Sequence, residues 1–249
     1  MAKSPTSAPA VPSAVAAFLD RAARLPALRA VPSAEADPAR LLFAVDATAS
    51  RQPAWDAACA VQGEMFEAVG GTGRLAVSLA YWRGYGEFAA TPWLTDPRDL
   101  ARRMAEVSCL GGRTQVLRAL DHALAEAGRV RRLGAVVLVG DAVEEAADPI
   151  CHAAGALGAR RVPVFCFQEG GDRAAEAVFR QVARLSGGAW AAFDARSPRT
   201  LADLLRAAAA CARSGRAAVA ALPGRAAASI AGQLPPPSPV SARPGSSAR

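Results

Sequence analysis

Short apolar runs alternate with amphipathic stretches of helical length from about residue 40 to residue 212. Runs rich in β-branched and aromatic residues, bounded by turn residues, predict strands; these are residues 41–45, 74–82, 87–93, 135–139, 162–167 and 189–193. Stretches with helical periodicity and with start and stop signals predict helices; these are residues 53–69, 96–107, 115–127, 148–159, 172–185 and 198–212.

This alternation of strands and helices predicts one α/β domain built on an open, mainly parallel sheet of six strands, with helices on both faces. Residues 41–45 and 135–139 are apolar without interruption, which is typical of strands buried on both faces. Residues 87–93 contain Pro92, so we expect a short antiparallel strand at the sheet edge. Open sheets of this kind carry their sites at the carboxyl ends of the strands.

The composition of the two ends predicts the boundaries of the domain, which we place at residues 37–213. Residues 1–36 are rich in Pro, Ser and Ala and predict a partly disordered tail with a short helix at 13–28. Residues 214–249 contain proline, serine and arginine and predict a disordered tail without a packed core. We therefore expect removal of residues 224–249 to leave the fold intact.

The formal net charge of +7 would ordinarily suggest a nucleic acid as partner, so its position along the chain matters. Residues 206–249 carry six arginines and no acid, and residues 1–40 add +2, which leaves residues 41–205 near −1. A near-neutral domain argues against a basic face that binds nucleic acid. A nucleic-acid-associated factor with arginine-rich tails stays an alternative, and it requires salt-dependent binding that is lost on removal of residues 214–249.

Cysteine usage and hydropathy bear on the compartment. The five cysteines are odd in number and show no C-x-x-C spacing, so they indicate neither a disulfide framework nor a zinc ribbon. No apolar signal segment and no run of about 20 uncharged apolar residues is found, so we expect a cytoplasmic protein without a membrane partner.

Oxygen-bearing side chains follow both buried strands. Asp46, Thr48 and Ser50 occupy alternate positions after the first buried strand, and Asp141 follows the second. Thr114 lies between them, where a glycine turn meets a predicted helix. Carboxylate and hydroxyl oxygens are the ligands of hard cations, so the sequence predicts a site for Mg²⁺ or Mn²⁺ at this edge of the sheet.

The pattern D-x-[ST]-x-S, a loop threonine and a later strand-end aspartate resembles the metal-ion-dependent adhesion site of von Willebrand factor A (VWA) domains, which have a Rossmann-like fold. The resemblance implies direct metal contacts from Thr48 and Ser50, a state-dependent contact from Thr114, and contacts through water from Asp46 and Asp141. Thr48 stands where many relatives have serine. The resemblance also implies a bacterial, cytoplasmic, non-catalytic module whose metal binds a partner's Asp or Glu carboxylate, and such domains often serve AAA+ ATPases or chaperones.

Two further interpretations stay open for parts of this pattern. A phosphatase of the haloacid dehalogenase type also carries a strand-end aspartate and Mg²⁺, but it needs a second aspartate where Thr48 stands, and its lysine is missing because Lys3 is the single lysine of the chain. Taken alone, Thr114 could cap a helix and Asp141 a turn. Glu144 and Glu145 lie just beyond Asp141 and could border the site, but we interpret them as a solvated acidic loop. We expect Gly111 and Gly112 to let the loop of Thr114 move.

Overall fold

The computed structural model describes residues 37–71 and 74–236. The short helix predicted at 13–28 and the end of the C-terminal tail, 237–249, lie outside the described residues. Within the described ranges, no helix is long and apolar enough to cross a membrane.

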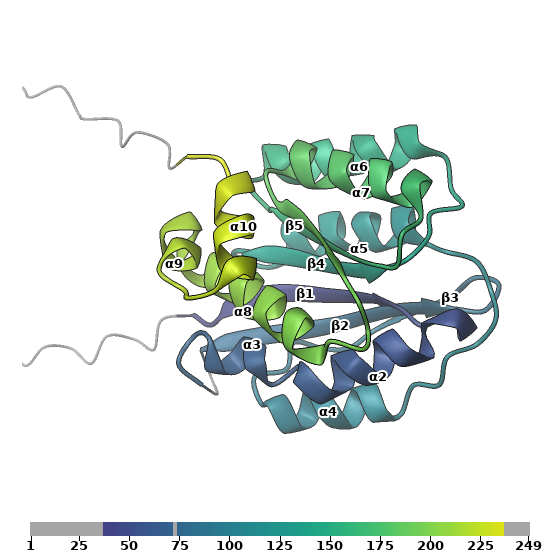
Figure 1. Cartoon of the computed structure of the whole chain (residues 1–249), viewed down its shortest axis with the longest axis horizontal. Helices are drawn as coiled ribbons and strands as arrows, with labels where there is room; N and C mark the ends of the chain where they lie inside the picture. The colour runs from purple at the N-terminus through teal and green to yellow at the C-terminus, as the bar shows by residue number, and fades with distance from the viewer. Residues whose placement is uncertain (1–36, 72–73, 237–249) are drawn as a thin grey trace, which may run out of the picture. The chain divides into compact units, whose positions relative to one another are not determined.

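A single six-stranded sheet forms the centre of residues 38–236, in the order β3-β2-β1-β4-β5-β6 (Figure 1). All neighbouring strands are parallel except β3, which runs antiparallel to β2. This confirms the predicted fold class. The strands are β1 (Ala39–Asp46), β2 (Leu75–Arg83), β3 (Glu87–Ala90), β4 (Ala135–Gly140), β5 (Val164–Glu169) and β6 (Ala189–Phe193).

Helices cover both faces of this sheet (Figure 1). One face carries α2 (Gln52–Val61), α3 (Glu64–Glu67), α4 (Pro97–Ala105) and α8 (Pro198–Ser214). The opposite face carries α5 (Val116–Arg129), α6 (Ala147–Ala159) and α7 (Arg173–Ser186).

The central strand shows why its sequence is apolar throughout. Successive side chains of a strand point to opposite faces of the sheet. Leu41, Phe43 and Val45 pack in the core under α2, α3, α4 and α8, whereas Leu42 and Ala44 pack under α5, α6 and α7. Each side chain of the run is therefore buried by helices on its own side.

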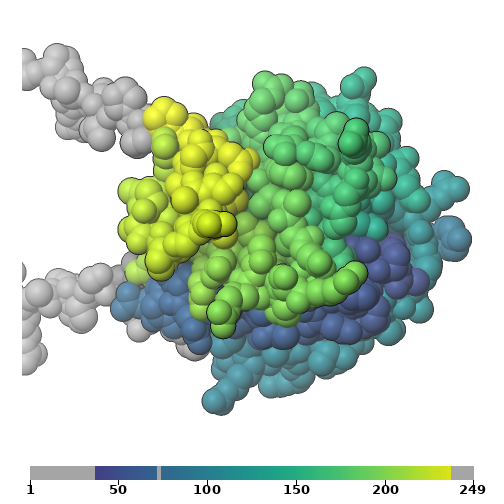
Figure 2. All heavy atoms as spheres, in the orientation of Figure 1, coloured from purple at the N-terminus to yellow at the C-terminus, as the bar shows by residue number. Residues whose placement is uncertain are grey.

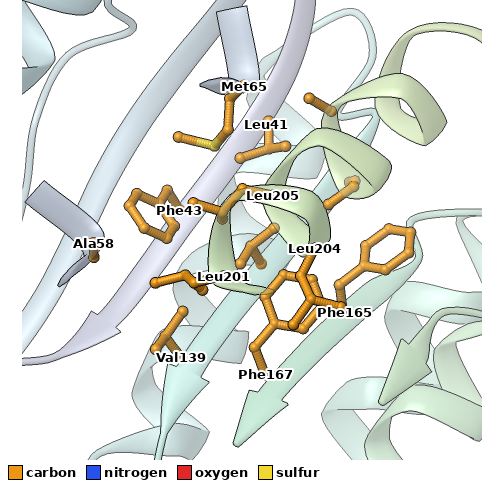
Figure 3. Packing of buried hydrophobic residues seen from close by; sticks show 14 of the residues in the cluster. Leu41, Phe43, Ala58, Met65, Val139, Phe165, Phe167, Leu201, Leu204 and Leu205 are labelled. Carbon is orange, nitrogen blue, oxygen red and sulfur yellow. The ribbon is translucent and has the colours of Figure 1, made fainter. Parts of the chain in front are cut away.

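Helix α8 supplies a stripe of leucines to the first of these cores. Leu201, Leu204 and Leu205 follow the i, i+3, i+4 spacing that places side chains on one face of a helix. All three are buried, and Figure 3 shows them among Phe43 and Phe167 of the sheet. The central strands β1 and β4 are thereby packed against α8.

Two predicted elements are shorter than expected. The helix predicted at 53–69 is divided into α2 and α3, with Gly63, a poor helix former, at the division. Strand β3 ends at Ala90 and does not reach 93, because Pro92 has no N–H to donate to the sheet.

The C-terminal region differs most from the prediction. Residues 214–236 were expected to lack structure, but they form α9 (Arg216–Ala220) and α10 (Arg225–Gln233), which pack on α8 and are drawn in yellow-green and yellow in Figures 1 and 2. Helix α10 also contacts β6. Its buried residues are Ala227, Ile230, Ala231 and, just after its end, Leu234. These positions follow the i, i+3, i+4, i+7 pattern of an apolar helix face, which explains why the segment folds although Pro223 and Gly224 precede it.

Part of the basic charge assigned to the tails therefore belongs to folded helices. Arg206 in α8 forms ion pairs with Glu64 and Asp203, and Arg213 donates a hydrogen bond of 2.8 Å to the carbonyl oxygen of Val69. These two arginines hold α8 against neighbouring segments, so their role within the described residues is structural.

A side chain of α10 forms hydrogen bonds with the backbone of the edge strand β6. The backbone N–H of Trp190 in β6 donates to Oε1 of Gln233 at 2.9 Å, and Nε2 of Gln233 donates to the carbonyl oxygen of Trp190 at 3.0 Å. The amide of Gln233 thus makes the pair of bonds that a neighbouring strand would make with this residue.

Candidate metal centre

The candidate site lies at the point where the strand order reverses. After β1 the chain adds β2 and β3 on one side of that strand, and it then crosses to the other side to form β4. The loops that leave β1 and β4 consequently diverge, and open α/β sheets bind ligands in the crevice between such loops. Asp46 and Asp141 lie at the ends of these two strands.

Asp46 is the last residue of β1 and is only 1% exposed. Its Oδ1 accepts a hydrogen bond of 2.7 Å from the backbone N–H of Thr48. Its Oδ2 is buried and has no hydrogen-bond partner among the described residues. A buried carboxylate oxygen without a partner destabilises the fold, and a bound cation would remove this cost.

Burial raises the pKa of Asp46 to about 6, and the nearby carboxylate of Asp141 adds to this rise. Hydrogen bonds from Thr48 and the positive charge of Arg51 oppose it. The net rise means that the surroundings stabilise the anion of Asp46 less than water does. A divalent cation bound at this carboxylate would offset that deficit.

The other predicted residues lie around this carboxylate at different depths. Thr48 is 7% exposed and closely follows the strand end, whereas Ser50 is exposed in a short 3-10 turn, η1 (Ala49–Arg51). Asp141 follows Gly140, the last residue of β4. The structure therefore brings Asp46, Thr48 and Asp141 together and leaves Ser50 at the rim.

Thr114 is held by the loop that follows Asp141. Its hydroxyl oxygen accepts a hydrogen bond of 3.0 Å from the backbone N–H of Glu144, and its own backbone N–H donates to Oε2 of Glu144 at 3.1 Å. This reciprocal pair joins the loop before α5 to the loop after β4, and both loops border the site.

Glu144 is exposed and Glu145 is half-buried, so the acidic loop is partly solvated as interpreted, but both carboxylates also accept backbone hydrogen bonds. The carboxylate of Glu145 accepts the backbone N–H groups of Val116 at 2.6 Å and Leu117 at 2.9 Å. It therefore caps the first turn of α5, whose N-terminal partial positive charge favours an anion. Thr114 is accordingly not the cap of this helix.

The loop of Thr114 also packs closely against the loop of Gly84. The N–H of Arg113 donates to the carbonyl oxygen of Gly84 at 3.2 Å, and the N–H of Leu110 donates to that of Ala47 at 3.0 Å. A Cβ added at Gly112 would lie 1.9 Å from the carbonyl oxygen of Gly84. Gly112 is thus needed for close packing of two loops, so the prediction that this loop moves rests on Gly111, where an added Cβ would meet nothing within 4 Å.

We expect Gly112→Ala to lower the free energy of unfolding by about 2 kcal/mol, because the added methyl group forces the two loops apart. Gly111→Ala is the matched control, since a Cβ there meets nothing within 4 Å. Denaturant unfolding of both variants measures the difference. Equal stabilities of the two variants would contradict the close packing of Gly112 against Gly84.

Sequence reasoning missed two charged residues of this site, Arg51 and Glu169. Nη1 of Arg51 forms a short ion pair with Oε2 of Glu169, at the end of β5, and Nη2 lies 3.2 Å from Oδ2 of Asp141. The end of a third parallel strand is the signal that could have pointed to Glu169. Arg51 follows the D-x-[ST]-x-S pattern directly, but nothing in that pattern assigns it a role.

Within residues 37–71 and 74–236, no three His, Cys, Asp or Glu side chains are grouped so that they could hold a metal ion. The groups near Asp46 that could hold a cation are the carboxylate of Asp141 and the hydroxyl of Thr48, with the thiol of Cys109 also close by. Oxygen donors of this kind suit Mg²⁺ or Mn²⁺.

Comparisons at the level of sequence find no match: no family model and no curated protein matches the chain. Solved structures do match. A von Willebrand factor type A protein from Catenulispora acidiphila superposes with a TM-score of 0.59 at 16% identity, over 71% of this chain and 43% of that chain. The present chain thus spans less than half the length of that protein.

Two further structures match at similar levels. Proximal thread matrix protein 1 from the mussel byssus, solved with a zinc-occupied MIDAS motif, gives a TM-score of 0.56 at 14% identity, over 70% of this chain and 46% of that chain. The VWA domain of SpRpn10 gives a TM-score of 0.52 at 9% identity, over 65% of this chain and 94% of that chain. At such identities the likeness concerns the fold alone, and with the sheet order described above it shows that this chain has the fold of von Willebrand factor A domains.

Proposed function

We propose that this chain is a non-catalytic module that binds a partner protein through a divalent cation, Mg²⁺ or Mn²⁺. Thr48 and Ser50 would hold the cation directly, Thr114 would do so in one state, and Asp46 and Asp141 would act through water. The bound ion would supply a strong local positive charge and an open position for a partner's Asp or Glu carboxylate. The observation that carries the proposal is the buried, unpartnered Oδ2 of Asp46 at the reversal point of the sheet.

The surface beside the site supports a protein partner. The two large apolar side chains that are exposed in the described part of the chain are Tyr85, at 88%, and Leu110, at 45%. The N–H of Leu110 donates a hydrogen bond to the carbonyl oxygen of Ala47, which lies inside the metal motif. The N–H of Gly84, the residue before Tyr85, donates to the carbonyl oxygen of Leu110. A partner segment with an acidic side chain between apolar residues would suit this surface. The cation would bind the acid, and Tyr85 and Leu110 would contact the apolar residues.

Two features of the site speak against a catalytic role. Burial raises the pKa of the neighbouring Cys109 to about 11, so its thiol stays protonated and is a poor nucleophile at neutral pH. Thr48 stands where a phosphatase of the haloacid dehalogenase type requires its second aspartate.

The proposal also includes a cytoplasmic location and a partner that belongs to an AAA+ ATPase or chaperone system.

Titration calorimetry with MgCl₂ and MnCl₂ tests the cation site. We expect binding in the micromolar to millimolar range, because the direct ligands are neutral hydroxyls. Thr48→Ala and Asp141→Ala should each weaken binding by about tenfold or more. Asp148→Ala, which removes an exposed carboxylate in the first turn of α6, is the control and should bind as the wild type does.

Equal affinities in the wild type and in both site variants would contradict the assignment of the site. Mg²⁺-dependent hydrolysis of phosphate esters or peptides by the purified protein would contradict the non-catalytic role.

A further inference from the structure

Arg51 places a positive charge of the protein itself at the candidate cation site. Its side chain is 11% exposed, and its guanidinium lies between Asp141, after β4, and Glu169, at the end of β5. Its Nη2 also donates to the carbonyl oxygen of Ser50 at 3.1 Å. Its Nε is buried and has no hydrogen-bond partner among the described residues.

We propose that Arg51 is the resident cation of this site and that it competes with the divalent ion for Asp141. The inference rests on the proposed function and deepens it, because it names the residue that sets the affinity for the metal. In the metal-free protein the guanidinium compensates the carboxylates, and binding of the ion requires Arg51 to release Asp141.

The electrostatics of the strand ends explain why a resident cation is needed. β1, β4 and β5 are neighbouring parallel strands, so their carboxyl ends lie side by side and carry Asp46, Asp141 and Glu169. Like charges gathered at a partly buried edge repel each other, and this repulsion would oppose folding. The positive charge of Arg51 offsets it without any bound ion.

The geometry of the guanidinium lets Arg51 release one carboxylate and keep the other. Its two terminal nitrogens contact different partners, Nη1 contacting Glu169 and Nη2 contacting Asp141. Arginine presents several donors in a fixed planar fork, so loss of one contact does not remove the other. Glu169 therefore retains Arg51 near the site while Asp141 turns to the metal.

Removal of the charge at position 51 should strengthen metal binding. We expect Arg51→Gln to bind Mg²⁺ and Mn²⁺ about tenfold more tightly or better than the wild type, because a like charge close to the ion is gone. Arg51→Lys keeps the charge but not the planar fork, and it should bind the metal less tightly than Arg51→Gln does. The matched control is Arg83→Gln, since Arg83 lies at the end of β2 and contacts Glu87 and Ser108.

Thermal unfolding supplies a second readout. In chelator, Arg51→Gln should melt below the wild type, because the carboxylates are no longer compensated. Saturating Mg²⁺ should raise its melting temperature by more than it raises that of the wild type.

Glu169→Gln tests the same competition without altering Arg51. Loss of Glu169 leaves the guanidinium with Asp141 as the carboxylate of its remaining ion pair, so metal binding should weaken. The same substitution in the Arg51→Gln background should have a smaller effect, which a double-mutant cycle measures.

The outcomes separate the inference from the proposed function. If the wild type binds Mg²⁺ and Arg51→Gln binds it no more tightly, the competition is refuted and the cation site stands. If Arg51→Gln binds Mg²⁺ and the wild type does not, the competition is supported, and the native chain keeps its own cation. If no variant binds Mg²⁺ or Mn²⁺, the cation site itself is refuted, and the inference with it.

Discussion

Deletion of residues 224–249 should lower the free energy of unfolding by more than about 4 kcal/mol. The deletion removes α10, and with it the buried side chains of Ile230 and Leu234 and the alanines between α10 and the core. It also uncovers the parts of α8 and β6 that α10 contacts. This expectation reverses the one drawn from composition alone, which treated the whole segment as dispensable.

Denaturant unfolding of three variants beside the wild type tests this role of α10. Deletion of residues 237–249 is the control, because it leaves every described contact in place, and it should leave stability unchanged. Ile230→Ala should cost about 2–4 kcal/mol, since a fully buried side chain is truncated. A deletion at 224 that unfolds at the same denaturant concentration as the wild type would show that α10 does not stabilise the domain.

Asp46→Asn should stabilise the metal-free protein by about 1–3 kcal/mol at pH 7 and abolish metal binding. The asparagine side chain would keep an oxygen to accept the N–H of Thr48 but would carry no charge. Burial has raised the pKa of Asp46 from its ordinary value to about 6, so ionisation in the folded state costs free energy. A residue that weakens the fold in the absence of its ligand is typical of a functional site.

The pH dependence distinguishes this mechanism from a general packing effect. Between about pH 4 and 6 the folded wild type binds more protons at Asp46 than the unfolded chain does, so its stability falls as the pH rises through this window. The asparagine variant does not lose stability in this way. In chelator, the difference in free energy of unfolding between the variant and the wild type should therefore grow as the pH rises through the same window. A difference in free energy of unfolding that stays constant from about pH 4 to about pH 8 would contradict the role of ionisation.

The fold could be predicted from the sequence because its strands are buried on both faces. An uninterrupted apolar run such as residues 41–45 has few alternatives in an α/β protein, and the helices between the runs carry clear start and stop signals. Helix α10 was missed because prolines and glycines around it dominated the composition. The apolar stripe from Ala227 to Leu234 is the local signal that outweighed them.

The candidate site could be predicted only in part, because strand ends are visible in a sequence and contacts between loops are not. Asp46 and Asp141 lie at the ends of apolar strands, so their approach could be foreseen. The reciprocal bonds of Thr114 and Glu144 join residues 30 positions apart. No periodicity encodes such a contact, nor the close approach of Gly112 to Gly84.

The bonds between Gln233 and Trp190 have a consequence for how copies of this protein meet. β6 is an edge strand, and the unpaired backbone groups of an edge are a template for a strand from another molecule. Here a side-chain amide from the same chain already satisfies the N–H and the carbonyl group of Trp190. Helix α10 therefore blocks intermolecular sheet extension at Trp190, and a strand from another molecule could pair with this residue only after Gln233 had been displaced.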